Sequence, residues 1–301
     1  MSNLRACIVG SGPAGLLTAK YISKFLPVTI FEKSNKILGN YNYSSEIKKA
    51  MYDKILENDA INIHFNRSFQ EKDQKDCDLI IMATGGVAKP PLKGTKSAFQ
   101  MIKNHFDNKK INIGRNICII GMGNVTMDLL NILNQKVDSV TVLSRSNLFN
   151  SKFDNSKIRD LLGKYEIFPI NSQLNTFKYQ NTTKNDIFSR KDITRKSIFN
   201  NLPKNPELPK LNLIFEASIE EIVDKNNKKQ IKYKINNSEF ITEVFDDVIS
   251  SIGFAPNNLN IVTNKPTYKI GWCKNPVGDI SDLSVEAQVL ADKIQKEFNN
   301  Q

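Results

Sequence analysis

The sequence from Ala6 to Glu32 constrains the fold more than any other part of the chain. It begins with a short apolar run, which predicts a buried parallel strand, and passes through a glycine-rich turn into a segment with helical spacing, Leu16 to Phe25. A second apolar run, Val28 to Phe31, predicts another strand that ends at Glu32. This order of strand, turn, helix and strand opens a doubly wound fold, so we expect an α/β chain with parallel sheets.

The turn reads Gly10-Ser-Gly-Pro-Ala-Gly15, the G-x-G-x-x-G pattern. In this pattern Gly10 permits the tight turn, Gly12 lets the backbone approach a pyrophosphate, and Gly15 lets helix and strand pack closely. The free N–H groups at the helix start face the anion, and Glu32, about 20 residues on, can accept from ribose hydroxyls. A glycine-rich turn without a ligand is the alternative. The predicted residues of this dinucleotide site are Gly10, Gly12, Pro13, Ala14, Gly15, Glu32 and Lys33.

The same pattern recurs after a second apolar run, Asn116 to Ile120, and is followed by the strand-like run Val140 to Leu143. Here Gly121 opens the turn, but Thr126 stands where the pattern has Gly or Ala, so we expect a looser second site. Asn124 at the helix start can cap the helix and contact a phosphate.

Arg145 follows the second strand of this unit, at the place where an acid would bind a ribose 2′-hydroxyl. An arginine suits a 2′-phosphate instead, which favours NADP over NAD; a plain surface arginine is the alternative. Two such units in one chain suggest FAD in the first and a nicotinamide dinucleotide in the second. Gly85 ends a further apolar strand in a Thr-Gly turn, where the sheet of a flavin enzyme commonly crosses toward its second domain.

Composition excludes several other classes of protein. The chain has 301 residues, enough for two domains, and is 40% apolar and 24% charged, as in globular proteins. Four cysteines without a C-x-x-C argue against a disulfide framework, a zinc site and a dithiol redox centre; we expect Cys7 and Cys118 to be small core residues. No apolar run is long enough to cross a membrane.

The net charge of +11 permits two interpretations. An acidic partner, a protein or a nucleic acid, would be attracted by such a charge, whereas a general bias toward Lys and Asn would have no dedicated surface. No nucleic-acid-binding motif accompanies the charge. The chain enters its first strand within about five residues, so we expect no ordinary targeting peptide and place the protein in the cytosol or in an organelle entered by another signal.

The rest of the chain gives coarser predictions. Loops are expected in the segment that follows Glu32 and around Pro203, Pro206 and Pro209, and a solvated hairpin at Lys225 to Lys234. Helices are expected at residues 45–58, 151–162 and 281–297, and further strands at 61–65, 78–82, 211–215, 230–235, 240–244 and 248–254.

Three motifs carry a resemblance to a known family. Gly121-x-Gly-Asn-Val-x-x-Asp128 follows the pattern G-x-G-N-V-A-x-D, Ser250 to Phe254 resembles S-S-I-G-Y, and Gly271 to Lys274 resembles G-W-x-K-R-G-P-T-G. These are motifs of adrenodoxin reductase, the mitochondrial type of NADPH:ferredoxin oxidoreductase. The chain resembles this family from about Leu4 to Phe298, in four islands.

The resemblance implies a two-domain fold of the glutathione-reductase type, with the nicotinamide domain, residues 105–253, inserted in the FAD domain, residues 1–104 and 254–301. It implies that FAD is bordered by Ala14, Glu32, Gly39, Asn40, Trp272, Gly278, Asp279 and Ile280. It implies that the nicotinamide dinucleotide is bordered by Gly123, Asn124, Val125 and Arg145. Asp128 is the candidate catalytic residue, as a polar group near the nicotinamide; the alternative is that it only favours the first turn of its helix.

The chain also departs from the family pattern. The segment L-V-R-x-G-V-A-P-D-H, expected after Gly39, is absent, and neither His64 nor His105 takes its place. Paired arginines become Arg145-Ser146, an acid on the following helix aligns with Lys157, and the G-P-T-G loop is shortened. We therefore expect a compact, divergent member with weakened NADP preference.

The expected activity follows from the resemblance. NADPH would reduce FAD, and FAD would pass single electrons to a small acidic [2Fe–2S] ferredoxin, for iron–sulfur cluster assembly in a mitochondrion or reduced mitochondrial organelle. We expect a monomer without metal or nucleic acid. Four rivals remain: a reductase of the thioredoxin-reductase type, a reductase subunit of a larger complex, a degenerate flavoprotein kept for binding, and a nucleic-acid-binding protein.

Overall fold

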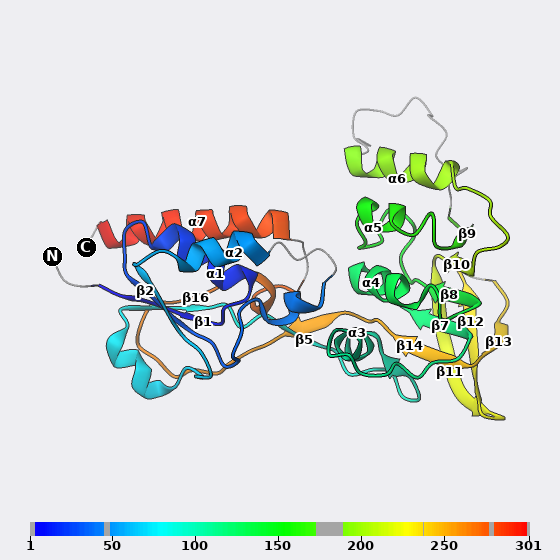
Figure 1. The fold of residues 1–301 in the computed structure, drawn as a ribbon, viewed down its shortest axis with the longest axis horizontal. Coiled ribbons are helices and arrows are strands. Elements are labelled where there is room, and N and C mark those ends of the chain that lie inside the picture. The colour runs from blue at the N-terminus through cyan, green and yellow to red at the C-terminus, as the bar shows by residue number, and fades with distance from the viewer. Residues whose placement is uncertain (1–3, 45–48, 173–188, 237, 277–279, 300–301) are drawn as a thin grey trace. The chain divides into compact units, whose positions relative to one another are not determined.

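The computed structural model describes residues 4–44, 49–172, 189–236, 238–276 and 280–299 (Figure 1). The chain forms two compact units. Unit 1 comprises Met1–Ala88 and Phe254–Gln301, and unit 2 comprises Lys89–Gly253.

Unit 1 is built on a sheet of five parallel strands in the order β16-β4-β1-β2-β3. Most of its strand residues are buried, because such a sheet is covered on both faces, and this is why its strands read as apolar runs. The strands are β1 (Ala6–Val9), β2 (Val28–Phe31), β3 (Ile61–His64), β4 (Leu79–Met82) and β16 (Thr267–Lys269).

Three helices cover one face of this sheet: α1 (Pro13–Ile22), α2 (Lys49–Leu56) and α7 (Ile280–Asn299) (Figure 1). Alternate strand residues such as Ala6, Ile8 and Ile30 pack with them in the main core. The other strand residues form a smaller core on the opposite face. The remaining elements are η1 (Gly39–Tyr43), η2 (Glu71–Asp76), η3 (Gly271–Cys273) and the antiparallel pair β5 (Gly86–Ala88) and β15 (Phe254–Pro256).

Unit 2 contains a sheet of six parallel strands in the order β6-β14-β7-β8-β10-β9. Its strands are β6 (Lys96–Ser97), β7 (Asn116–Ile120), β8 (Ser139–Leu143), β9 (Glu166–Ile170), β10 (Lys210–Ile214) and β14 (Asp247–Ser250). A layer of helices lies on one side of the sheet: α3 (Ala98–Phe106), α4 (Asn124–Leu133), α5 (Asn155–Arg159) and α6 (Arg190–Asn200) (Figure 1). An antiparallel meander lies on the other: β11 (Ala217–Lys225), β12 (Lys228–Ile235) and β13 (Ile241–Phe245).

These two parallel sheets confirm the predicted α/β fold class. The helix expected at 151–162 and the strand expected at 248–254 are shorter, and α3, α6, β5, β6, β9, β11 and β16 were not predicted. The first boundary between the units also differs from the expected 104/105: the compact units divide after Ala88, because β6 pairs with β14 and α3 packs against α4.

The cysteine prediction was wrong in one respect. Cys7 and Cys77 form a disulfide, with Cα atoms 5.6 Å apart and both side chains buried. Cys7 lies in β1 and Cys77 just precedes β4, the neighbour of β1, so the sheet brings together two residues that are 70 apart in the chain. No local spacing could have indicated this pair. Cys118 is a free core thiol, as expected, and burial raises its pKa.

Within the described part of the chain, no helix is both long and apolar enough to cross a membrane. The described residues also contain no group of three or more His, Cys, Asp or Glu side chains that could hold a metal ion.

Candidate dinucleotide sites

The first glycine loop lies at the carboxyl end of β1, where the strand order reverses between β2 and β4. Gly10 has a φ of +104°, and a Cβ there would lie 2.6 Å from the carbonyl oxygen of Ala83. A Cβ at Gly15 would lie 2.0 Å from the carbonyl oxygen of Gly10. A Cβ at Gly12, in contrast, would meet no atom within 4 Å. The loop is therefore closed at its first and third glycines, where a side chain has no room, and open at the second, where the space is free. A site for a pyrophosphate requires this arrangement.

The helix that follows this loop starts without a side-chain cap. Gly12 is the N-cap of α1, Pro13 occupies the first helical position, and the first turn has no acidic residue. Pro13 has no N–H to satisfy, and the other N–H groups of this turn are left for a ligand. The geometry thus supports an anion at this helix start.

Glu32 lies directly after β2 and is only 6% exposed. One carboxylate oxygen accepts from the N–H of Ser11 at 2.9 Å and from its hydroxyl at 2.7 Å. The other accepts from the N–H and the hydroxyl of Ser34, both at 2.8 Å. These four donors take up the acceptor positions of the carboxylate, so a ribose hydroxyl would have to replace a serine hydroxyl, which can rotate away. Sequence reasoning missed both serines.

Two other predicted residues of this site lie in η1. Gly39 has a φ of +47° with open space where a Cβ would be, and Asn40 donates to the carbonyl oxygen of Gly86 at 2.8 Å. Leu38, which precedes them, donates its N–H to the carbonyl oxygen of Ser11 at 2.8 Å. This bond ties the segment to the glycine loop.

The C-terminal part of unit 1 completes the same surface. Trp272 packs over Gly86, where an added Cβ would lie 3.3 Å from its ring, and its ring centroid is 4.8 Å from that of Phe254. Gly271 has a φ of +66°, and a Cβ there would lie 2.8 Å from the Cβ of Ala14. The turn that carries Trp272 therefore rests on the start of α1.

The structure thus gathers most of the residues predicted for the first site at one edge of the sheet. Gly85, at a φ of +72°, leaves open space beside Gly86, whereas the Lys33 side chain is exposed. Gly278 and Asp279 lie outside the described residues. Ile280 is the first residue of α7, and its side chain also lies outside the description.

The second glycine loop repeats this steric plan at the carboxyl end of β7, where the order reverses between β8 and β14. Gly121 has a φ of +101°, and a Cβ there would lie 2.2 Å from the carbonyl oxygen of Ser251; a Cβ at Gly123 would meet nothing within 4 Å. The buried hydroxyl of Thr126 donates to the carbonyl oxygen of Gly121 at 2.7 Å and lies 2.9 Å from the hydroxyl of Ser251. Thr126 thus ties the loop together where the pattern has glycine.

The expected capping role of Asn124 was wrong. The N-cap of α4 is Gly123, and no side chain forms a capping hydrogen bond there, because Asn124 lies one position inside the helix. The Asn124 amide pairs instead with Asp154: it donates to the carboxylate at 2.6 Å and accepts from the Asp154 N–H at 2.8 Å. This pair connects the glycine loop to the segment before α5. Val125, the next residue, is half-buried.

Asp128 forms a buried ion pair with Lys157 of α5, with 2.7 Å between Oδ1 and Nζ. Lys157 is 4% exposed and Asp128 is 9% exposed. Asp128 does not lie in the first turn of α4, so the structural alternative weighed for it was wrong. A role beside the nicotinamide stays a prediction, and the buried cation beside Asp128 was not anticipated.

Arg145 follows β8 and its side chain is exposed. It has no hydrogen-bond or ion-pair partner among the described residues. A free guanidinium at the end of the second strand of such a unit is available to a 2′-phosphate.

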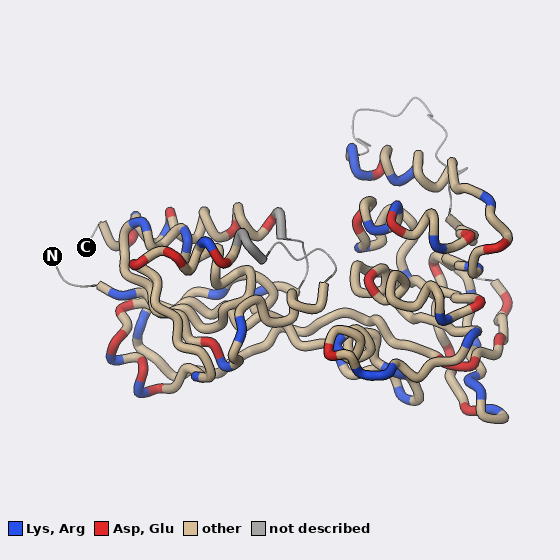
Figure 2. The backbone as a smooth tube through the Cα atoms, viewed as in Figure 1, with Lys and Arg blue, Asp and Glu red and all other residues tan. Residues whose placement is uncertain are grey.

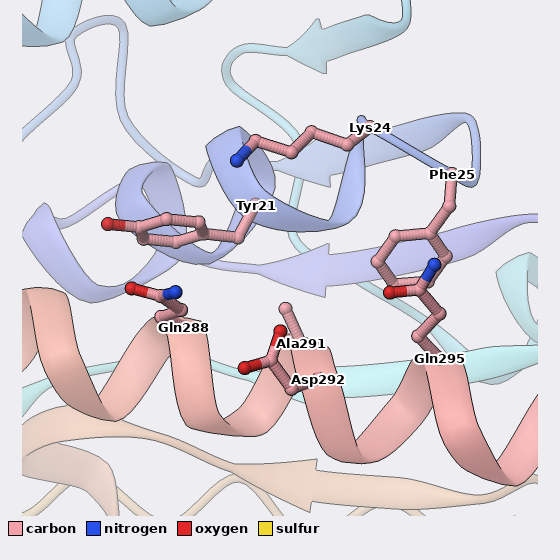
Figure 3. A pocket seen from close by; sticks show the side chains of 7 residues that line it. All are labelled: Tyr21, Lys24, Phe25, Gln288, Ala291, Asp292 and Gln295. Carbon is pink, nitrogen blue, oxygen red and sulfur yellow. The ribbon is translucent and has the colours of Figure 1, made fainter.

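One groove of about 180 Å³ lies in unit 1 between the C-terminal end of α1 and the face of α7 (Figure 3). It is lined by Tyr21, Lys24, Phe25, Gln288, Ala291, Asp292 and Gln295. Because the glycine loop meets the opposite end of α1, this groove is separate from the dinucleotide site.

Lys and Arg are interspersed with acidic residues over both units (Figure 2). The net charge of +11 therefore still permits both interpretations, a general bias and an acidic partner.

Comparison with known proteins gives similarity in sequence and in fold. No family model matches the chain. In sequence it is 26% identical over 196 residues to cindoxin reductase from Citrobacter braakii; the match covers 51% of this chain and 44% of that relative. The chain thus matches less than half the length of this curated relative.

In fold the chain is similar to FprA from Mycobacterium tuberculosis, solved in complex with NADPH: the TM-score is 0.80 at 17% identity, over 99% of this chain and 85% of that one. It is also similar to thioredoxin reductase from T. acidophilum, with a TM-score of 0.56 at 13% identity, over 97% of both chains. The predicted resemblance to the adrenodoxin reductase family and the glutathione-reductase type of fold are confirmed.

Proposed function

We propose that this chain, which resembles the adrenodoxin reductase family in sequence and fold, is an NADPH-dependent flavoprotein reductase. FAD would bind unit 1 and NADP(H) would bind unit 2. The observation that carries the proposal is the repetition of one steric plan at the two strand-order reversals: a closed first glycine and an open second glycine at Gly10 and Gly12, and again at Gly121 and Gly123.

The residues present fit the two cofactors. At the first site, Gly12, Gly39 and Gly85 leave free the space that side chains would have filled, so a cofactor has room there. At the second site, Gly123 offers the same room. When bound, the flavin would supply the two-electron and one-electron chemistry.

The chain's own residues would bind and orient the cofactors. The first turns of α1 and α4, which have no side-chain caps, would donate N–H groups to the pyrophosphates. Glu32 would accept from the ribose of the first dinucleotide, and Arg145 would pair with the 2′-phosphate of the second. Trp272, packed beside Phe254 and Gly86, would shield this edge of unit 1 from water.

The deciding experiment is an anaerobic absorbance spectrum of the purified chain, before and after addition of NADPH. Visible flavin bands that bleach with NADPH support the proposal. Bands that persist with both NADPH and NADH contradict the reductase activity but leave flavin binding intact. If no bands are present even after FAD is supplied, the whole assignment is wrong.

We propose a small acidic [2Fe–2S] ferredoxin as the electron acceptor, with iron–sulfur cluster assembly in a mitochondrion-type organelle as its purpose. What supports this acceptor is the resemblance, together with the net charge of +11, which would favour an acidic partner. Ferredoxin-dependent reduction of cytochrome c should therefore slow as salt is raised, because salt screens charges between exposed surfaces. A rate that does not depend on ferredoxin would contradict this choice of acceptor, and cell fractionation tests the compartment.

A flavin-binding protein with little reductase activity is the second candidate. The observation that favours it is the buried pairing of Asp128 with Lys157, which engages the one acid predicted to lie near the nicotinamide. Persisting flavin bands in the first experiment would select this candidate.

A further inference from the structure

The side chain of Arg195 is fully buried in unit 2. It lies in the middle of α6, a helix that starts with a capping box between Ser189 and Asp192. Burial lowers the pKa of Arg195, and the charges of Asp192 and Asp154 act in the opposite direction. A buried cation is costly to an isolated domain unless its donors are satisfied, so its partners indicate what it does.

Most of those partners are carbonyl oxygens of one loop, residues 147–154, which follows β8 and Arg145. One terminal nitrogen of Arg195 donates to the carbonyl oxygens of Leu148 and Ser151, both at 2.9 Å. The other donates to the carbonyl oxygen of Phe153, and the guanidinium lies 4.2 Å from the centre of the Phe153 ring. An arginine presents five N–H donors on three nitrogens in a fixed planar fork, whereas a lysine has three donors on a single nitrogen and cannot reproduce this spread of contacts.

Asn155, the first residue of α5, adds two further hydrogen bonds to α6. The Nε of Arg195 donates to the side-chain oxygen of Asn155 at 3.0 Å, and the amide of Asn155 donates to the carbonyl oxygen of Lys191 at 2.9 Å. The end of the loop is therefore fixed to α6 at two places.

The other side of the same loop holds the second glycine loop. Lys152 forms a parallel backbone bridge with Gly123, the open glycine. Asp154 pairs with Asn124 through the two hydrogen bonds described above. The loop 147–154 is therefore bonded to Arg195 on one side and to the start of α4 on the other.

We infer that Arg195 is a positioning residue for the second dinucleotide: it fixes loop 147–154, and this loop holds Gly123 and Asn124 where the pyrophosphate would bind. The inference rests on the proposed function and deepens it, because it assigns a role to a helix that no glycine motif contains. Arg195 does not touch the ligand. It acts through the bridge at Lys152 and the pair at Asp154.

The test uses the full chain loaded with FAD, and NADP⁺ as the probe. Arg195→Lys keeps a charge but not the fork, and Arg195→Met removes both. We expect each to raise the dissociation constant of NADP⁺ at least about tenfold, which corresponds to about 1.4 kcal/mol, while the bound FAD is retained. Arg190→Gln, an exposed arginine of the same helix, is the matched control and should bind NADP⁺ as the parent does.

Two further measurements separate positioning from a general loss of stability. Ile231→Ala weakens the core under the meander, far along the chain from the loop, and should lower stability without changing NADP⁺ affinity. Hydrogen exchange without ligand should be faster at residues 147–154 and 123–125 in Arg195→Lys than in Ile231→Ala. In a double-mutant cycle, Arg195→Lys and Asn124→Ala should lose less affinity together than the sum of their separate losses, because both act through one loop.

The results distinguish the inference from the function on which it rests. Unchanged NADP⁺ affinity in both Arg195 variants overturns the inference and leaves the proposed function standing. So does an equal loss of affinity in Ile231→Ala at equal stability. A parent chain that retains FAD but does not bind NADP⁺ overturns the nicotinamide site itself, and the inference with it.

Discussion

At the scale of single residues, Glu32 links the first glycine loop to the segment after β2 through its four hydrogen bonds to Ser11 and Ser34. Glu32→Gln keeps the shape but loses the charge, and hydrogen bonds to a charged group contribute about 1.5–3 kcal/mol. We expect this variant to lower the thermal stability of unit 1 and to raise the FAD dissociation constant about tenfold or more. Asp53→Asn, at an exposed acid of α2, is the control, and an unchanged flavin affinity in Glu32→Gln would contradict the role.

The buried pair of Asp128 and Lys157 gives a second prediction at this scale. Lys157→Met leaves a buried carboxylate without its cation, which costs about 3–5 kcal/mol. Lys157→Met combined with Asp128→Leu removes both charges and should recover most of the loss. Urea unfolding measures both effects. A double variant no more stable than Lys157→Met would show that Asp128 and Lys157 are not each other's main partners.

Single residues also show the limit of sequence reasoning. The tight turns at Gly10 and Gly121 and the close approach of Gly15 to Gly10 could be predicted, because the positive φ values and this one contact arise within each loop itself. The hydrogen bonds from Ser11 to Glu32 could not be predicted, nor could the pairing of Asn124 with Asp154, because in each pair the two residues come from different parts of the chain.

At the scale of elements, the turn before β7 is held by the carboxylate of Asp246. It accepts from the N–H of Asn116 at 2.9 Å and of Arg115 at 3.0 Å, and pairs with Lys228 at 2.9 Å. The hydrogen bond from Asn116, followed by that from Lys228, holds the pKa of Asp246 below its ordinary value.

Because this pKa is lowered on folding, the stabilisation is complete above the ordinary carboxyl pKa of about 4 and is lost as the pH falls through the lowered value. Asp246→Asn should therefore flatten the fall of stability with pH below about 4, relative to the parent. Thermal unfolding measured from pH 7 down to pH 3 checks this, and parallel curves for the two proteins would contradict it.

The start of α4 depends on the hydroxyl of Thr126, which bonds to Gly121 and lies near Ser251. Thr126→Ala removes the donor and should cost about 1–2 kcal/mol of stability, with weaker NADP⁺ binding. Thr126→Ser keeps the hydroxyl and serves as the control. Thr126→Ala with full stability would mean that the hydrogen bond contributes nothing.

The elements that sequence reasoning found are those with a clear apolar period, such as β1, β4, β7 and α4. Of those it missed, α6, β9 and β11 lack this signal, whereas α3 buries Ala98, Met101 and Ile102 at helical spacing and could have been predicted. In α6 the buried positions are Arg195 and Phe199, so its buried face does not read as an apolar stripe. In β9, Pro169 lies in a strand, which an edge position allows, and in β11 a register shift between Ile219 and Glu221 breaks the alternation.

At the scale of the whole molecule, the Cys7–Cys77 disulfide closes a long loop within unit 1 only. A cross-link across 70 residues stabilises a folded chain by about 4 kcal/mol in the chain-entropy description. Cys7→Ala, Cys77→Ala and the double variant should therefore destabilise unit 1 to a similar degree, and should leave hydrogen exchange in unit 2 unchanged. Cys273→Ala, at a free buried thiol of the same core, is the control; a double variant as stable as the parent would show that the link does not stabilise the fold.

The division of the chain also has a consequence for its synthesis. Unit 1 is discontinuous: β16, which covers the edge of β4, and α7, which packs on α1, both follow unit 2 in the sequence. When the ribosome has made the first 253 residues, unit 2 is complete, but the N-terminal sheet still has a bare edge and an uncovered helix. Since such surfaces are prone to aggregation, the nascent chain carries this risk until β16 and α7 emerge and cover them.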